Sequence, residues 1–152
     1  MAATTFDGID DLKARVGDHL GYSDWIEVTQ ERVNLFADAT DDHQWIHVDL
    51  EKAKAGPFGG PIAHGYLTVS LAPALSAQIY TIKGVSMGVN YGSNKVRFPA
   101  PVPVGANLRM GAKLLAADDI AGGVQITVEC TFEVEGSAKP ACVAENVYRI
   151  YA

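Results

Sequence analysis

Three aspartates and two histidines gather within ten residues, in the stretch DATDDHQWIH at positions 38–47. The chain has only 4 histidines, so half of them lie beside these carboxylates. Aspartate and histidine are the residues that transfer protons in catalysis and that hold metal ions. Three interpretations follow for this stretch: a general acid–base pair, a metal site or a solvated turn.

The acid–base interpretation rests on the residues around His47. Trp45 and Ile46 are large apolar side chains that favour burial, so His47 directly after them is drawn into a partly buried wall. Asp42 lies five residues earlier, across a turn, where it can face the imidazole. Buried carboxylates and imidazoles are costly unless they satisfy each other, and such pairs are where perturbed pKa values concentrate. We predict that Asp42 and His47 form a general acid–base pair, with a solvated turn as the alternative.

The spacing gives less support to a metal site or to a nucleophile. His43 and His47 are four residues apart, as in the HExxH motif, but the glutamate is missing and the two aspartates before them favour a turn. We therefore expect no metal ion. No G-x-S-x-G motif occurs, and Ser70 and Ser76 lie inside an apolar segment, so nucleophilic catalysis is not expected.

A glycine-rich loop, GPFGGPIAHG at positions 56–65, precedes an apolar helix. The first N–H groups of a helix have no internal partner and carry partial positive charge. The N–H of Gly65 can therefore donate to a carbonyl oxygen that becomes negative during a reaction, and glycine permits close approach of a substrate. A simple helix-start glycine is the alternative. We interpret His64 as structural, ordering this loop.

Four elements are expected in the N-terminal half to position these residues. Residues 6–17 indicate a short amphipathic helix that ends at a glycine. A strand follows over Trp25–Val28, and then a helix that begins at the N-cap Thr29 and stops near Thr40, where paired aspartates favour a turn. Residues 48–56 indicate a second short helix, closed by a glycine.

The segment YLTVSLAPALSAQIY at 66–80 reads as a helix that is apolar almost all round and so buried on most faces. Pro73 lacks an N–H donor and should kink or break it. Several prolines and polar residues interrupt the uncharged run, which argues against a transmembrane span.

From Val85 onward the hydrophobic period changes to two, which indicates strands. Four strand candidates are separated by short turn sequences, which suits antiparallel neighbours in a meander; they cover residues 85–98, 107–117, 124–136 and 141–152. Strands segregated after helices indicate the α+β class. We predict one domain over residues 1–152, a curved antiparallel sheet wrapped around the buried apolar helix.

Composition limits the function classes. The chain has 152 residues, 48% of them hydrophobic and 20% charged, with a net charge of −6. This is the composition of a globular protein, and the negative charge argues against a general nucleic-acid or anionic-membrane surface. Cys130 and Cys142 have no CxxC partner, so reduced thiols and a cytoplasmic location are expected. No apolar signal segment is visible at the N-terminus.

Two motifs in order resemble a known family. FADATDDHQWIHVD followed by GPFGGPIAHGYLTVSL is similar to the (R)-specific enoyl-CoA hydratases, the MaoC-like dehydratase group with the hot-dog fold. Asp42 and His47 fall on the Asp and His of the family signature, and Ala63, His64 and Gly65 fall on its later aliphatic-small-His-Gly step. NKVRFPAPVPVG resembles the family's strand, turn and strand after the central helix.

Three positions depart from the signature. Gln44 stands where the family usually has Asn, and Trp45 where it usually has Pro. Asp41 replaces the usual Gly before the catalytic Asp. A glycine there can adopt a positive φ, which aspartate tolerates better than most residues. Asp41 also adds a second negative charge beside Asp42.

The resemblance implies a trans-2-enoyl-CoA substrate, hydrated reversibly to a (3R)-hydroxyacyl-CoA without a cofactor. Asp42 and His47 would hold the water, and the Gly65 N–H would hold the thioester oxygen. The helix and sheet would line an acyl tunnel, and a homodimer is implied. Lys95 and Arg97, two apart on one strand face, are the basic pair expected to meet the acidic coenzyme. The rivals are a dehydratase acting on acyl-carrier-protein substrates, a thioesterase of the same fold and a non-catalytic acyl-thioester binding module.

Overall fold

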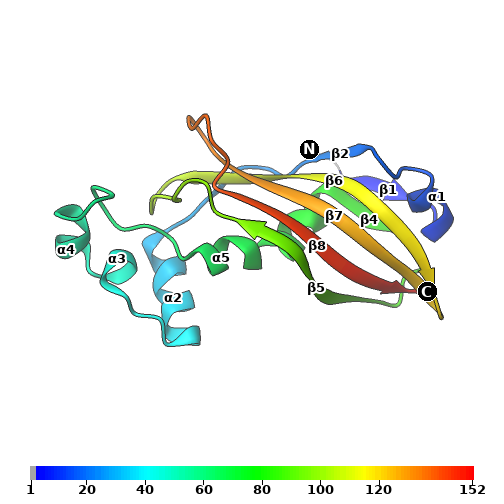
Figure 1. The fold of residues 1–152 in the computed structure, drawn as a ribbon, viewed down its shortest axis with the longest axis horizontal. Coiled ribbons are helices and arrows are strands. Elements are labelled where there is room, and N and C mark those ends of the chain that lie inside the picture. Colours follow the sequence, from blue (N-terminus) through cyan, green and yellow to red (C-terminus); the bar gives the residue numbers. More distant parts are fainter. Residues whose placement is uncertain (1–2) are drawn as a thin grey trace.

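A computed structural model of the protein describes residues 3–152 and contains one large antiparallel sheet, with helices along it and at both of its ends (Figure 1). The helices are α1 (Ile9–Lys13), α2 (Gln30–Thr40), α3 (Trp45–Val48), α4 (Leu50–Lys54), α5 (Gly65–Ser70) and α6 (Ala72–Ile79). The strands are β1 (Thr4–Phe6), β2 (His19–Tyr22), β3 (Ile26–Glu27), β4 (Tyr80–Ile82), β5 (Met87–Arg97), β6 (Asn107–Ile120), β7 (Gly123–Val134) and β8 (Cys142–Tyr151).

The large sheet has the strand order β2-β6-β7-β8-β5, and the short β3 also pairs with β6. All of its pairings are antiparallel. It curves along the length of the molecule, while α2, α3 and α4 lie together at one end (Figure 1). The predicted α+β class and curved antiparallel sheet are confirmed. A separate parallel pair joins β1 to β4. Neither of these strands, nor β2, was predicted from the sequence.

The predicted four-stranded meander is wrong in one connection. β5 pairs with β8 and not with β6, so the short proline-rich segment between β5 and β6 spans the sheet and closes no hairpin. That segment instead pairs with the glycine-rich loop, where Ile62 forms a bridge with Pro103 and the Ala63 N–H donates to the Val102 carbonyl over 2.8 Å. The connection therefore holds the loop that leads into α5.

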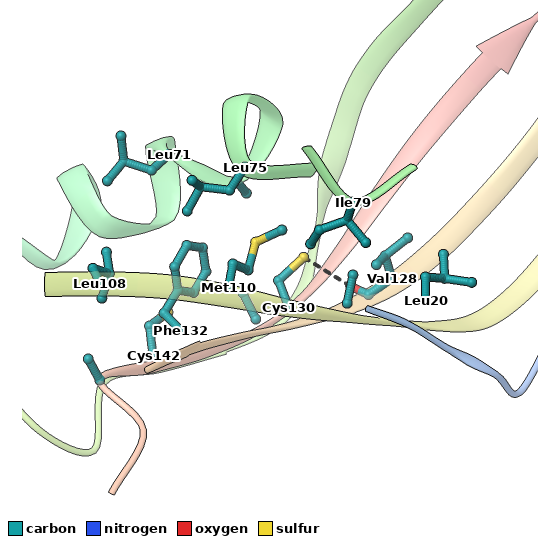
Figure 2. Packing of buried hydrophobic residues seen from close by; sticks show 14 of the residues in the cluster. Leu20, Leu71, Leu75, Ile79, Leu108, Met110, Val128, Cys130, Phe132 and Cys142 are labelled. Carbon is teal, nitrogen blue, oxygen red and sulfur yellow. Dashed lines mark hydrogen bonds between the residues drawn. The ribbon is translucent and has the colours of Figure 1, made fainter. Parts of the chain in front are cut away.

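The core lies between the helical segment of α5 and α6 and the sheet. Leu71, Leu75 and Ile79 belong to one hydrophobic cluster with the sheet, and Leu75 and Ile79 lie over Met110 of β6 and Cys130 of β7 (Figure 2). The sheet covers only one side of this segment. The expectation of a helix buried on most faces is therefore wrong for the single chain, because the opposite side faces outward.

Two further features of the same helical segment bear on the sequence predictions. Tyr66 is 77% exposed, which marks the side that the sheet leaves open. The helix breaks at Leu71, and Pro73 lies in the first turn of α6, where a missing N–H costs nothing, so the predicted break is confirmed. No helix within residues 3–152 has both the length and the apolar character that crossing a membrane requires.

The ends of α2 follow the sequence prediction closely. The Thr29 hydroxyl accepts a hydrogen bond from the Arg32 N–H over 3.1 Å, which is the expected N-cap. The helix ends at Thr40, and Asp41 takes the left-handed conformation with φ 60° and ψ 22°. The chain therefore leaves α2 through a tight turn and delivers Asp42 to the start of the next segment.

Candidate active site

His47 is fixed in one tautomer by its backbone contact. It lies on the short helix α3 and is only 6% exposed, so it is more deeply buried than the sequence predicted. Its Nδ1 lies 2.6 Å from the Ile62 carbonyl oxygen. A carbonyl only accepts, so Nδ1 carries the hydrogen and Nε2 presents a free lone pair. His47 is therefore prepared to accept a proton at Nε2.

His64 connects the glycine-rich loop to the backbone of Asp42. Its Nε2–H donates to the Asp42 backbone carbonyl over 3.0 Å. The ring is 2% exposed, stacks on His47 with centroids 3.8 Å apart and contacts Phe36 at 4.9 Å. This arrangement fits the predicted loop-ordering role. The stacking on His47 was not predicted, although the Ala-His-Gly step marked the residue.

The structure brings Asp42, His47 and His64 together. Each offers a donor atom within 4.8 Å of the others, and the Asp42 side chain remains exposed while both imidazoles are buried. The Asp42 carboxylate and the His47 imidazole can therefore both hydrogen-bond to one intervening water molecule. His43 points away and lies 2.8 Å from Asp38 in an exposed pair, so it does not join the site.

Burial lowers the pKa of His47. The Ile62 hydrogen bond opposes this shift, the neighbouring His64 adds to it, and the Asp42 carboxylate opposes it. The ring is therefore neutral at pH 7 and can act as a base.

Because the pKa of His47 is lowered in the folded state, both activity and stability should fall as the solution becomes acidic. Below the ordinary imidazole pKa of about 6.5 the unfolded chain binds more protons than the folded one, so the stability contributed by neutral His47 is present above that pH and is lost as pH falls. We expect kcat/KM to stay level through neutral pH and to fall with an apparent pKa below about 6.5. Rate profiles and denaturation midpoints from pH 4 to 8 measure both. An acid limb centred above pH 7 would contradict this account of His47.

Asp42, His47 and His64 include the donor types of a zinc site. The metal site considered from the residue spacing would use His43, which instead pairs with Asp38. His64 Nε2 is already engaged by the Asp42 backbone carbonyl, so only its Nδ1, which has no hydrogen-bond partner among residues 3–152, is free to bind an ion.

We expect prolonged dialysis against EDTA to leave the reaction rate unchanged, because an acid–base pair can transfer the protons without a metal ion. A matched sample dialysed without chelator is the control. Loss of activity that zinc restores would replace the metal-free account.

Asp41 occupies the only left-handed position held by a non-glycine residue within residues 3–152. Its φ of 60° confirms the conformation expected where the family has glycine. We expect Asp41→Gly to keep or increase activity and to stabilise the fold by about 1 kcal/mol, because glycine adopts this conformation without a Cβ penalty.

Asp41→Asn is the matched control for charge, since asparagine tolerates the same conformation. Thermal midpoints and kcat/KM of the two variants separate the backbone strain at position 41, which only glycine relieves, from the effect of the Asp41 charge, which both variants remove. A hundredfold loss of rate in either variant, on the scale of one lost catalytic donor, would show that Asp41 takes part in the chemistry.

Gly65 is the first residue of α5, and its N–H finds no acceptor among residues 3–152. It lines a cavity of about 370 Å³ together with Thr68 and Phe98. A Cβ on Gly65 would lie 3.0 Å from the Phe98 ring, so a side chain there is crowded. Gly65 therefore packs closely against the segment after β5, and its predicted approach to a substrate stays a prediction.

Two departures from the family signature are accommodated locally. The Gln44 backbone N–H lies 3.4 Å from the Asp42 carboxylate and donates to it. The Trp45 ring covers Gly56, where a Cβ would lie 2.8 Å from it, and Lys52 lies over the same ring at 4.8 Å. These contacts anchor the turn that separates Asp42 from His47.

The two basic residues predicted for coenzyme binding lie near the end of β5. Lys95 is 3.7 Å from Glu145 on the neighbouring strand, and Arg97 donates to the Val96 carbonyl. Both side chains are exposed. Arg97 directly precedes Phe98, which lines the cavity at Gly65.

Comparison with known proteins defines the class. The fold matches that of the (R)-hydratase from A. caviae involved in PHA biosynthesis, with a TM-score of 0.72 and 26% identity over 88% of this chain and 94% of that one. This is the hot-dog fold.

Residues 11–136 match the model of the MaoC like domain family, and the chain belongs to this MaoC-like dehydratase family. It is 60% identical to the 3-hydroxyacyl-thioester dehydratase Z of Mycobacterium tuberculosis over 97% of this chain and 99% of that one. It is 44% identical to Nodulation protein N of Rhizobium leguminosarum bv. viciae over 88% of this chain and 85% of that one.

Proposed function

We propose that the protein catalyses the reversible, (R)-specific hydration of trans-2-enoyl-CoA to (3R)-hydroxyacyl-CoA. The observation that carries this proposal is the pairing of Asp42 with a buried His47 whose Nε2 is left free by the Ile62 contact. The names of two similar proteins, a 3-hydroxyacyl-thioester dehydratase and an (R)-hydratase, support the same reaction.

The proposed chemistry is addition of water to a polarised double bond. Asp42 and His47 hold one water, and together they take its proton while its oxygen bonds to C3. Negative charge then moves to the thioester oxygen, which the Gly65 N–H stabilises as an enolate. One member of the pair returns a proton to C2 and completes the product. No group outside the chain and substrate is needed, because the thioester itself delocalises the charge.

Binding of the coenzyme requires local positive charge, since the protein carries a net charge of −6. Lys95 and Arg97 remain our candidates for contact with its phosphates, because both are exposed and Arg97 adjoins the Gly65 cavity through Phe98.

We propose that the protein is a homodimer. β5 ends the large sheet and is exposed along most of its length, including the apolar Met87, Val89 and Tyr91. An exposed strand edge of this kind favours pairing with a second sheet edge. The free, buried thiols of Cys130 and Cys142 support the proposed cytoplasmic location.

Dehydration of an acyl-carrier-protein substrate is the second candidate function. The name of the 60% identical relative specifies a thioester and leaves its carrier open. The discriminating experiment presents the same enoyl chain on coenzyme A and on acyl-carrier protein, with loss of enoyl absorbance as the readout. We expect a higher kcat/KM for the coenzyme A form. Preference for the carrier protein would favour the second candidate. Release of free thiol would indicate a thioesterase, and saturable binding without turnover would indicate a binding module.

A further inference from the structure

Three cavities follow one another along α5 and α6, beginning beside the candidate site. The cavity at Gly65 and Thr68 lies at the start of α5. A second cavity, of about 270 Å³, begins one turn further along at Val69 and Ser70. A third, of about 310 Å³, adjoins it and reaches Ser76 on α6. The last two together are called the distal groove.

The distal groove is bounded by helix on one side and by β5 and β8 on the other. Its two cavities share Pro73 of α6, Asn90 of β5 and Tyr148 of β8. From Gly65, Val69 and Pro73 are four and eight residues along the helical segment, which corresponds to about 6–12 Å at the helical rise. A chain whose thioester lies at Gly65 would therefore place its middle carbons in this groove.

The wall of the distal groove carries a partly buried polar network centred on Asn146. Asn146 is 4% exposed, accepts a hydrogen bond from the Ser93 hydroxyl over 2.8 Å and donates to the Tyr148 hydroxyl over 3.3 Å. The other contact of its amide is the weak acceptor sulfur of Cys130, at 3.7 Å. A network of this kind lowers the stability of the fold unless every polar group in it has a hydrogen-bond partner.

Tyr148 is the member of this network that can still donate. Its oxygen accepts from Asn146, and its own O–H has no acceptor among residues 3–152. Burial raises the pKa of Tyr148 to about 12, so the phenol keeps its proton. A purely alkyl chain in the groove would cover this hydroxyl and the Asn90 amide without pairing them, whereas an oxygen acceptor on the chain would satisfy them.

We propose that the distal groove selects acyl thioesters whose chain carries a hydrogen-bond-accepting oxygen in its middle, and that Tyr148 is the residue that recognises it. Asn90 lies across the groove on β5, and its side-chain amide supplies a second donor beside the Tyr148 hydroxyl. This inference rests on the proposed function, because it takes the thioester to lie at Gly65. The shared chemistry of the substrates is the acceptor oxygen of a keto, hydroxyl or ether group.

The test compares four acyl chains of equal length on coenzyme A. One is an unbranched ten-carbon trans-2-enoyl chain, and the others carry a single ether oxygen in place of the sixth, seventh or eighth carbon. We expect the wild-type protein to hydrate the best ether chain with a kcat/KM at least about tenfold above the alkyl chain, on the scale of one unpaired buried donor.

Tyr148→Phe keeps the ring and removes the donor, so it should abolish that preference. It should leave the rate with crotonyl-CoA unchanged, because a four-carbon chain does not reach the groove. Asn90→Leu is the second variant, on an exposed strand, and should reduce the preference in part. Crotonyl-CoA also separates the two proposals. No hydration of crotonyl-CoA or of any of the ten-carbon chains would overturn the proposed function. Normal hydration with equal use of ether and alkyl chains, or a preference that survives Tyr148→Phe, would overturn the oxygen-selective groove.

Discussion

Replacing Asp42 by Asn or His47 by Gln should each lower kcat/KM by about 10²–10⁴, the usual contribution of general acid–base catalysis. If both residues hold one water, neither works alone. Removing the carboxylate leaves the imidazole with a misplaced water, and removing the imidazole leaves the carboxylate unable to complete the pair. The double variant should then be little worse than either single one, because groups that act as a unit are strongly non-additive.

The comparison needs kcat/KM for all four proteins and proof that each is folded. His43→Gln is the matched control, because His43 belongs to the same stretch but pairs with Asp38 at the surface. It should keep normal kinetics. Losses that simply multiply in the double variant would show that Asp42 and His47 act independently, and the shared-water mechanism would have to be abandoned.

A side chain at Gly65 should also cause a large loss. Gly65→Val keeps the backbone N–H but adds bulk where the thioester oxygen must approach, and we expect kcat/KM to fall by about 10²–10³, as for one lost oxyanion donor. Circular dichroism should show an intact fold. Near-normal kinetics in this variant would place the thioester elsewhere.

The crowding at Phe98 calls for a control, since a Cβ on Gly65 would lie 3.0 Å from that ring. Phe98→Ala alone, and combined with Gly65→Val, separates two causes of the loss. If the side chain blocks the thioester, the combined variant stays impaired. If activity returns when the ring is shortened, the loss came from displacing Phe98 and not from the oxyanion site.

Local features of the sequence predicted local structure well. The N-cap at Thr29, the end of α2 at Thr40 and the positive φ at Asp41 each depend on a few neighbouring residues, and the structure has all three. The alternation in residues 124–136 likewise holds, with Val128 and Cys130 fully buried in β7. Each of these features is fixed by the preferences of residues within one or two turns of it.

Long-range pairing could not be derived in the same way. A period of two assigns faces to a strand but not neighbours, so the pairing of β5 with β8 left no sequence signal. The short strands β1, β2 and β4 are defined by partners far along the chain. The open side of α5 and α6 was missed because an apolar sequence specifies burial without saying what covers it.

The candidate site shows the same contrast between local features, which the sequence predicts, and long-range contacts, which it does not. The spacing of Asp42 and His47 and the Gly65 step were visible in the sequence, because short motifs carry them. The Ile62 carbonyl that sets the His47 tautomer is a backbone group in a glycine-rich loop, and no side-chain pattern marks it. The stacking of His64 on His47 likewise depends on how that loop folds back over α3.

The most direct test of the central claim follows trans-2-enoyl-CoA hydration by the wild-type protein and by Asp42→Asn in one assay. Enoyl absorbance reports turnover, a thiol reagent reports hydrolysis, and an (R)-specific 3-hydroxyacyl-CoA dehydrogenase reports the configuration of the product. The account predicts rapid loss of enoyl absorbance, no free thiol and a product oxidised by the (R)-specific enzyme, with the rate nearly abolished in Asp42→Asn. Release of thiol, an (S) product or an undiminished rate in Asp42→Asn would contradict it.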